Sequence, residues 1–418
     1  MAEPTPTKSA PLAESPFEHT WRGNTLALSL GAFHNTMGFT IYFPFLPFIV
    51  MEMGVEGELE TVVGMLVGAF FVVSFLLGPV WGGMADHFGR KTMVLRAGFG
   101  MGIGFALLAM APNLWWFLPF YALVGVFNGY VPAAMALVAT NTPPRRMGRA
   151  ISTLQTLLLL GTTVGPALGA FLAGVLPMYR YLFWFSSGAS LVAGTVALFF
   201  TREVHIRPEG PFRLHLIADA RKILRAPRMG LLMMLNFIFS LSFFGSTTVV
   251  AVYTLQMAKG QTHMDGLAME TWVGLVALAL TISSALAAPV WGRLLDRFEP
   301  RLVLAIGLGL TTASLLPIPF VTTPLELTIV RVLLGLLSVG CQPAVVQLIK
   351  LEAPSGMEAR ALALGSSMMM LGNGGGPFLA GIIGPLMGLP AYFGFNALLV
   401  LVGLVLWVLL GVKARSRL

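Results

Sequence analysis

The sequence Pro79-Val80-Trp81-Gly82 returns as Pro289-Val290-Trp291-Gly292 in the other half of the chain, and this repeat indicates how the chain is built. An aspartate follows each copy at the same spacing, as Asp86 and Asp296. The offset is 210 residues (79 to 289) in a chain of 418. Both copies close an apolar run, where a membrane helix would end in a short basic loop. Many secondary transporters are built from repeated membrane units, so this repeat favours transport.

The composition is that of a membrane protein. Charged residues make up 11% of the chain and hydrophobic residues 56%, and the mean hydropathy is +0.82. Soluble domains contain about 25% charged residues, whereas a membrane-spanning helix needs roughly 20 apolar residues. We expect an all-α integral membrane protein with twelve transmembrane helices in two pseudo-symmetric six-helix bundles. The spans are expected at 24–51, 61–85, 92–112, 114–139, 149–175, 180–201, 229–256, 270–292, 301–320, 324–349, 359–386 and 389–412.

The basic residues predict the topology. With the first residue placed in the cytoplasm, only Arg180 and Lys259 of the 26 Lys and Arg fall in outer segments, and Arg331 falls within a span. Such an excess of inner positive charge predicts that both termini are cytoplasmic. The net charge of +8 therefore reflects topology and contact with anionic lipids, and it does not indicate a nucleic-acid partner. The sole cysteine, Cys341, excludes an intrachain disulfide.

The chain divides into five expected segments. The terminal ones are polar and read as cytoplasmic tails, the first of them disordered and without the features of a cleaved signal. Leu214–Leu224 in the linker has apolar residues at helical spacing, which predicts a short amphipathic helix on the inner leaflet; a plain solvated linker is the alternative. The segments are the tail 1–20, the first bundle 21–201, the linker 202–228, the second bundle 229–412 and the tail 413–418.

The loop after the second span resembles the signature of the major facilitator superfamily, G-x-x-x-D-(R/K)-x-G-R-(R/K). It reads Gly82-Gly83-Met84-Ala85-Asp86-His87-Phe88-Gly89-Arg90-Lys91, with a histidine in place of one base. The resemblance implies that Asp86 docks against the start of the eleventh span, near Glu358–Arg360, and braces the outward-open state. It assigns conformational gating to Gly82, which allows close helix approach, and to Asp86, Gly89, Arg90 and Lys91. A topology anchor without a gating role is the alternative.

The second copy of this loop departs from the pattern. Glu299 and Pro300 replace the glycine and arginine, while Asp296, Arg297 and Arg301 remain. We expect these three residues to form a weaker latch that faces the start of the fifth span, near Arg149.

The fifth span contains Gly161-Thr-Thr-Val-Gly165-Pro166-Ala-Leu-Gly169-Ala170. It resembles the G-x-x-x-G-P-x-x-G-G motif of the drug/proton antiporter branch of that superfamily, the multidrug efflux type, with Ala170 in place of the last glycine. Gly161, Gly165 and Gly169 allow close packing, and Pro166 bends the helix. The resemblance implies that the bend seals the outer half between the bundles. A packing face with no role in transport direction is the alternative.

Charged residues within the spans are scarce. Many proton-coupled members of that superfamily carry an R-x-x-x-G motif in the fourth span, where this chain has Tyr121 and Gly125; the arginine occurs instead in the tenth span, as Arg331 before Gly335. A buried charge is costly unless it faces a cavity or a partner, so Arg331 is a candidate for proton coupling. Snorkelling to the outer headgroups is the alternative. None of the 18 acidic residues lies near mid-membrane.

His34 in the first span is the other candidate for proton coupling, because an imidazole can bind and release a proton near neutral pH. A polar cavity contact or a packing role are the alternatives. Polar and aromatic residues at mid-span depth are expected to line a substrate cavity between the bundles, although each could instead bond a neighbouring helix. They are His34, Asn35, Tyr42, Asn128, Gln155, Asn236, Phe243, Tyr253, Gln342 and Asn373, with Met368–Met370 beside them.

These observations favour a secondary active transporter that exports lipophilic small molecules by alternating access, in exchange for protons. The 23 methionines and 30 phenylalanines favour an adaptable apolar cavity. A lipid or glycolipid flippase on the same scaffold is the alternative. A membrane enzyme or receptor is not favoured, because the spans lack a nucleophile–base pair, a metal cluster or paired carboxylates. We expect no cofactor or metal, protons and membrane lipids as partners, a monomer, and a multi-pass position in the plasma membrane (the inner membrane of a bacterium).

Overall fold

The computed structural model describes residues 20–55, 57–203, 216–257, 263–264, 267–355 and 357–412. Residues 1–19 and 413–418 of the expected tails, 204–215 of the linker, and Lys259 lie outside this part of the chain. The described chain is mainly helical, with one antiparallel ribbon formed by β1 (His263–Met264) and β2 (Leu267–Ala268).

Twelve spans follow one another along the chain, as expected. Ten described helical segments are long and apolar enough to cross a membrane, and the first and eleventh spans, which carry more glycine and polar residues, complete the set. The first half contains α1 (Trp21–Tyr42), η1 (Phe43–Phe45), α2 (Leu46–Glu52), α3 (Leu59–Phe88), α4 (Arg90–Met110), α5 (Leu114–Phe127), α6 (Tyr130–Thr140), η2 (Pro144–Arg146), α7 (Met147–Ala173), η3 (Tyr179–Tyr181) and α8 (Leu182–Phe200). After α9 (Leu216–Leu224), the second half contains α10 (Met229–Met257), α11 (Met269–Arg297), α12 (Pro300–Leu315), η4 (Ile318–Phe320), α13 (Pro324–Ser338), α14 (Cys341–Glu352), α15 (Glu358–Met387), α16 (Leu389–Leu406) and η5 (Trp407–Val412).

The two halves repeat their internal hydrogen bonds, as copies of one unit should. Trp81 Nε1 donates to the Val126 carbonyl over 2.9 Å, and Trp291 Nε1 donates to the Leu336 carbonyl over 2.8 Å. Donor and acceptor are 45 residues apart in both halves. A second pair of bonds, each spanning 51 residues, joins Ser74 Oγ to the Gly125 carbonyl and Ser284 Oγ to the Gly335 carbonyl.

These repeated bonds hold a broken helix in each bundle. The fourth span is interrupted between α5 and α6, where Gly129 has a φ of 125°. The tenth span is interrupted between α13 and α14. A helix end leaves its last carbonyls without an intrahelical donor, and Trp81 and Trp291 supply donors at both breaks. The repeated stretch that defines the two halves therefore stabilises these interruptions.

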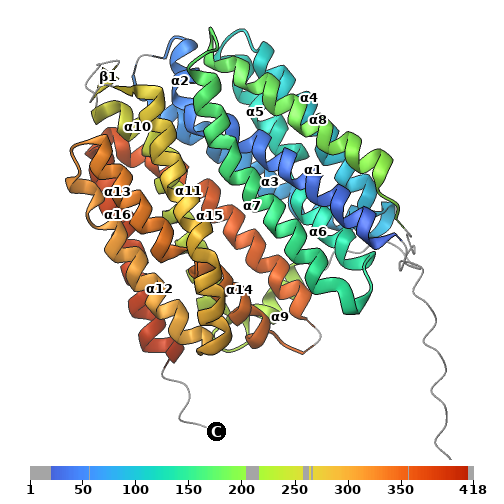
Figure 1. The fold of residues 1–418 in the computed structure, drawn as a ribbon. Helices are drawn as coiled ribbons and strands as arrows, with labels where there is room; N and C mark the ends of the chain where they lie inside the picture. The colour runs from blue at the N-terminus through green and yellow to red at the C-terminus, as the bar shows by residue number, and fades with distance from the viewer. Residues whose placement is uncertain are drawn as a thin grey trace, which may run out of the picture.

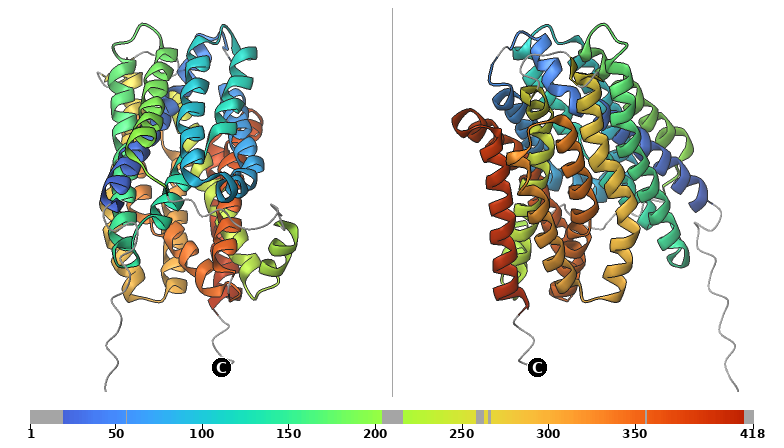
Figure 2. Two further views of the ribbon diagram at one scale, coloured as in Figure 1. Left: turned by 90° about the vertical axis from the view of Figure 1, so that its right-hand side faces the viewer. Right: turned by 60° about the vertical axis from the view of Figure 1, so that its left-hand side comes forward.

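The two bundles meet at one end of the molecule and spread apart toward the other. We call them the α2 end, which holds α2 and η3, and the α9 end, which holds α9 and the α3–α4 and α11–α12 junctions. Figure 1 shows the start of α1 and the end of η5 at the α9 end. The right-hand view of Figure 2 shows the bundles close together at the α2 end and separated at the α9 end. The distribution of basic residues predicts that the α9 end faces the cytoplasm.

The helix α9 occupies part of the segment expected to form an amphipathic helix. It contacts α10 and α15, and Ile223 on it is 1% exposed. Its apolar side therefore packs against the second bundle. A position on the inner leaflet stays a prediction.

Candidate functional site

A cavity of about 270 Å³ lies between the two bundles. One wall comes from α7 of the first bundle, and the others come from α10, α11, α13 and α14 of the second. Phe239 and Phe243 stack in the wall with ring centroids 5.6 Å apart. None of the described lining residues is charged, so the cavity offers apolar surface with a few hydroxyl and amide groups. The lining residues are Leu159, Thr162, Phe239, Phe243, Leu280, Thr281, Ser284, Ser338, Val339 and Gln342.

Contacts between the bundles close the α2 end. The Thr61 hydroxyl on α3 donates to the Gly381 carbonyl on α15 over 2.8 Å. Phe244 on α10, next to a cavity residue, lies against Phe43 and Phe71 of the first bundle, with ring centroids 5.6 and 4.9 Å away. These contacts stand between the cavity and the α2 end, whereas the bundles are separated at the α9 end (Figure 2).

The α7–α11 contact at this seam depends on small residues. A Cβ added to Gly274 of α11 would lie 2.6 Å from Ala170 Cβ of α7. This separation is too short for two carbon atoms, so the helices approach this closely only because residue 274 is glycine. Ala170 is the residue that replaces the last glycine of the fifth-span motif.

Tyr179 forms a hydrogen-bonded bridge between the bundles at the α2 end. Glu52 at the end of α2 accepts hydrogen bonds from the backbone N–H groups of Tyr179 and Arg180, and the Tyr179 ring stacks on Phe48 with centroids 4.9 Å apart. The Tyr179 hydroxyl donates to the carboxylate of Glu270, in the first turn of α11. The bridge therefore anchors η3 within the first bundle and links it to the second.

Arg96 lies inside α4, within the expected third span. Its guanidinium stacks on the Trp81 ring at 4.0 Å from the centroid. Nη1 and Nη2 donate to the carbonyls of Val126 and Asn128, each over 3.1 Å. Arg96 therefore caps the break between α5 and α6. The sequence did carry a signal, because Asn128-Gly129 within a span is a turn-forming pair.

The first loop motif is held within its own bundle by Glu203, which follows α8. The Glu203 carboxylate accepts from the backbone N–H groups of Arg90 and Lys91 over 2.8 and 2.9 Å, and so caps the start of α4. Lys91 Nζ donates to two carbonyls at the end of α8. Gly89 has a φ of 95°, and a side chain there would meet the Glu203 carboxylate at 2.8 Å. Glu203 was missed in the sequence because it lies outside the motif.

The close helix approach expected at Gly82 is absent, because no atom lies within 4 Å of a Cβ added there. The spread of the bundles at the α9 end explains this difference. The Asp86 side chain lies outside the described part of the structure, so its docking stays a prediction.

In the second loop motif, Arg301 makes its ion pairs within the second bundle. Glu352 at the end of α14 pairs with Arg301 at 2.6 Å and with Arg228 at 3.1 Å. Asp296, Arg297 and the start of α7 at Arg149 are exposed. The expected latch between this loop and the fifth span is therefore not formed in this arrangement of the bundles.

The glycines of the fifth span pack α7 against α1 of the same bundle. A Cβ at Gly161 would lie 2.6 Å from the Phe33 carbonyl oxygen, and one at Gly165 would lie 2.9 Å from that of Met37. Gly169, one turn further, also faces α1. At this height it is Ala170 that contacts the second bundle, at Gly274. The roles of the motif in sealing the outer half and in transport direction stay predictions.

Two of the expected cavity residues, Phe243 and Gln342, line the cavity. Gln342 Nε2 donates to Met369 Sδ on α15 over 3.1 Å. Gln155 is exposed on α7, one turn from the cavity toward the α9 end, and Asn373 is half-buried one turn along α15 from Met369. Phe243 and Gln342 therefore line the cavity, and the roles of Gln155 and Asn373 in it stay predictions.

Five other residues were wrongly expected to line the cavity. They are buried or half-buried inside a single bundle, because a polar group within a span needs a partner and a neighbouring segment supplies it. Their bonds are Asn35 Nδ2 to Met101 Sδ (3.5 Å), Tyr42 hydroxyl to Tyr121 hydroxyl (3.2 Å), Asn128 Nδ2 to Ser74 Oγ (3.2 Å), Asn236 Nδ2 to the Gly365 carbonyl (2.7 Å) and Tyr253 hydroxyl to the Val321 carbonyl (3.0 Å).

His34 lies on the perimeter of the first bundle, which corrects its placement in the cavity. On α1, Met37 packs against α7 and Gly38 against α8, and His34 lies on the helix face between them. Leu30 on that face is 36% exposed, and its carbonyl oxygen is 2.8 Å from His34 Nδ1. Phe43, on the opposite face, contacts α10. This position gives no support to proton coupling through the cavity.

Arg331 is 0% exposed, so the snorkelling alternative is wrong. Its Nη2 donates to Thr247 Oγ1 on α10 over 3.4 Å, while Nε and Nη1 have no partner among the described residues. The Thr247 hydroxyl in turn donates to the carbonyl of Phe243, which lines the cavity. A buried positive charge therefore lies one turn of α10 from the cavity wall.

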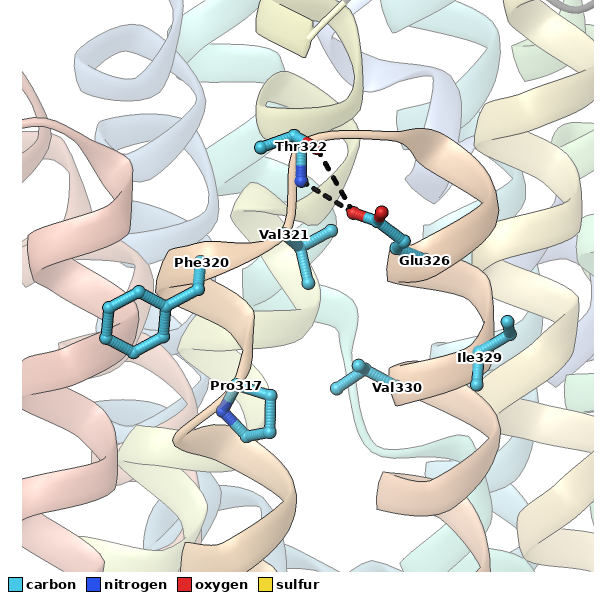
Figure 3. A pocket seen from close by; sticks show the side chains of 7 residues that line it. All are labelled: Pro317, Phe320, Val321, Thr322, Glu326, Ile329 and Val330. Carbon is cyan, nitrogen blue, oxygen red and sulfur yellow. Dashed lines mark hydrogen bonds between the residues drawn. The ribbon is translucent and has the colours of Figure 1, made fainter.

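A second hollow, of about 410 Å³, lies at the α2 end between η4 and α13 (Figure 3). The Glu326 carboxylate in it accepts hydrogen bonds from the backbone N–H groups of Thr322 and Thr323 and completes the capping box of α13. Its lining comes only from the segment 317–330 of one bundle. The hollow does not join the two bundles, and its carboxylate is already used by the cap, so we do not take it as the functional site.

Comparisons with known proteins agree with this geometry. The sequence model of the Major Facilitator Superfamily matches residues 28–269 and 263–417. The chain is 33% identical to "Multidrug resistance protein MdtG" of Klebsiella pneumoniae (strain 342), over 93% of this chain and 92% of that protein. It is 31% identical to the protein of the same name from Serratia proteamaculans (strain 568), over 93% and 94%.

Solved transporters have the same fold. The human organic anion transporter MFSD10 (TETRAN) aligns with a TM-score of 0.70 and 20% identity, over 93% of this chain and 99% of that chain. A bacterial homologue of the human lysosomal transporter Spinster, inward-facing and unoccupied, aligns with a TM-score of 0.72 and 14% identity, over 94% and 97%. At these identities the likeness shows the fold alone.

Proposed function

Because this chain belongs to the Major Facilitator Superfamily, we propose that it exports lipophilic small molecules, such as drugs, by alternating access and in exchange for protons. It is a multi-pass membrane transporter and not an enzyme. The observation that carries the proposal is the uncharged cavity between the bundles, which is closed at the α2 end and lies above the separated α9 end. Its relatives named as multidrug resistance proteins support a lipophilic substrate.

Opening of the α2 end would expose the cavity to the other side of the membrane. It requires α3 to part from α15 and α7 from α11. Among the described residues the seam includes small residues, a few aromatic contacts and the hydrogen bonds from Thr61 to Gly381 and from Tyr179 to Glu270. Such a seam can separate without unfolding either bundle, and the cavity stays between the two rocking units.

We keep Arg331 as the candidate for proton coupling. Its charge is buried one turn from the cavity wall, and no carboxylate pairs with it among the described residues. A second positive charge in the cavity is therefore disfavoured, so Arg331 would favour an uncharged substrate.

Proteoliposomes that contain a trapped pH-sensitive dye test the proposal. With a proton gradient imposed, lipophilic drugs from a mixed panel should cause protons to cross the membrane in exchange. The dye should report this change of internal pH only in vesicles that contain active protein. Drug movement that ignores the gradient would indicate a uniporter or a flippase, and a lack of any drug movement would reject export.

Asp86→Asn tests the gating role that the loop motif implies. The substitution removes the charge that the family motif uses as a brace, so transport should weaken while ligand binding in detergent is spared. Transport at the wild-type rate by Asp86→Asn would contradict the bracing role, and it would leave the proposed role of the cavity unchanged.

A further inference from the structure

We infer that the cavity selects ligands by their hydrogen-bond donors, and that its substrates are uncharged aromatic compounds carrying hydroxyl or N–H groups. This inference rests on the proposed function, because it names the chemistry that the cavity between the bundles would accept. It follows from the hydrogen bonds that the polar hydrogens of the lining side chains already make within the protein.

All four hydroxyl groups in the cavity donate to backbone carbonyls. A carbonyl oxygen can only accept, so the hydroxyl must be the donor in each bond. Each hydroxyl oxygen keeps its lone pairs and meets a ligand as an acceptor. The bonds run from Thr162 to Leu159 (2.7 Å), from Thr281 to Ala277 (3.1 Å), from Ser284 to Gly335 (3.3 Å) and from Ser338 to Leu334 (2.6 Å).

Gln342 is the one lining side chain with N–H groups among the described residues. One of its two N–H hydrogens points to Met369 Sδ at 3.1 Å, which leaves one N–H and the amide oxygen for a ligand. The cavity therefore offers a ligand four hydroxyl oxygens and this amide oxygen as hydrogen-bond acceptors, but only one free N–H group as a donor. A ligand that brings donors can bond at once, whereas a ligand with acceptors alone must first break the existing hydroxyl bonds.

The charge and shape of the cavity further restrict the ligands that it can accept. No carboxylate lines the described cavity, and the buried guanidinium of Arg331 lies one turn of α10 away. A permanent cation would meet a like charge without a counter-ion. Phe239 and Phe243 stack with their ring planes at 16°, and such a wall packs well against a third aromatic ring.

A matched set of ligands tests the inference by isothermal titration calorimetry on the purified chain in detergent. The set is 4-octylphenol, its methyl ether 4-octylanisole, and N,N,N-trimethyl-4-octylanilinium. These share a ring and tail, and they differ in having a donor, no donor, or a permanent charge. The phenol should bind roughly fivefold to tenfold more tightly than the ether, as one neutral hydrogen bond allows, and the cation should bind more weakly than both.

Two threonine variants connect this preference to the cavity. Thr162→Val removes one acceptor from α7, and Thr281→Val removes one from α11. Each substitution breaks only a bond within its own helix, so the packing between helices is kept. Because Ser284, Ser338 and Gln342 keep their acceptor oxygens, the double variant should show a smaller preference for the phenol over the ether than the wild-type chain does. Thr281→Ser should keep the wild-type preference. Thr195→Val is the matched control, because Thr195 makes the same kind of bond to Leu191 on an exposed face of α8.

The outcomes separate the inference from the proposed function. Equal binding of phenol and ether by the wild-type chain, or an unchanged preference in the double variant, overturns donor selection and leaves the cavity as a binding site. Tighter binding of the cation overturns the charge argument. Failure to bind any of the three compounds rejects both donor selection and the cavity as the site of lipophile export.

Discussion

Adding one methyl group at Gly274 should move the protein away from the arrangement that is closed at the α2 end. The new Cβ would lie 2.6 Å from Ala170 Cβ across the seam, 0.8 Å less than the 3.4 Å at which ordinary contact begins. Overpacking of this kind costs about 1–3 kcal/mol. Only the closed arrangement bears the cost, because opening separates α7 from α11. The ratio of closed to open molecules should therefore fall by about 5- to 150-fold.

The seam provides a control and a rescue for Gly274→Ala. Gly292→Ala adds the same methyl group to the same helix at a place where no atom lies within 4 Å, so the ratio should stay unchanged. Ala170→Gly removes the methyl group that the new side chain would meet. The double variant should therefore return toward the wild-type ratio, since the two sites are in direct contact.

Distances between spin labels measure this ratio. Val175 and Phe320 lie at the α2 end in different bundles and are 62% and 82% exposed, so cysteines there accept nitroxide labels once Cys341→Ser removes the native thiol. Double electron–electron resonance should report longer distances in Gly274→Ala than in the wild-type chain. An unchanged distribution, or a shift that Ala170→Gly does not reverse, would refute the steric reasoning.

Three further substitutions test separate parts of the structure. Tyr179→Phe removes the hydroxyl that donates to Glu270; a bond to a charged group contributes about 1.5–3 kcal/mol, so the same label pair should report opening, and unchanged distances would exclude a latch. Trp291→Phe leaves the Leu336 carbonyl unpaired at a helix break, which should cost about 1–3 kcal/mol and lower the thermal unfolding midpoint in detergent; an unshifted midpoint contradicts this. His34→Leu should keep proton-driven transport at the wild-type rate, because this residue lies on the perimeter, and a loss of gradient dependence would restore its coupling role.

The spans were predictable because each depends on local hydropathy, and the duplication was predictable because Pro79–Gly82 and Pro289–Gly292 are identical. The direction of a side chain around its helix was not predictable in the same way. His34 and Asn35 are neighbours at one depth, yet one lies on the perimeter and the other bonds α4. Depth is encoded along the chain, whereas direction depends on which helices pack on each side.

The cavity itself was largely hidden from the sequence. Thr162 and Thr281 resemble any hydroxyl residue of a membrane helix, and only the meeting of α7 with α11 places them in one cavity. Ser284 did carry a signal, because it occupies the place of Ser74 in the repeat and makes the same bond. The bridge at Tyr179 could not be predicted, since it joins segments that meet only when the bundles dock.

Transport requires the α2 end to open, and a reversible crosslink across it tests this requirement most directly. A Cβ at Gly68 of α3 would lie 3.3 Å from Phe378 Cβ of α15, close to the roughly 3.5–4.5 Å between the Cβ atoms of a disulfide. In a Cys341→Ser background, oxidation of the Gly68→Cys and Phe378→Cys pair should stop transport while ligand binding persists, and a reductant should restore transport. Undiminished transport by the fully crosslinked protein would contradict alternating access through the α2 end.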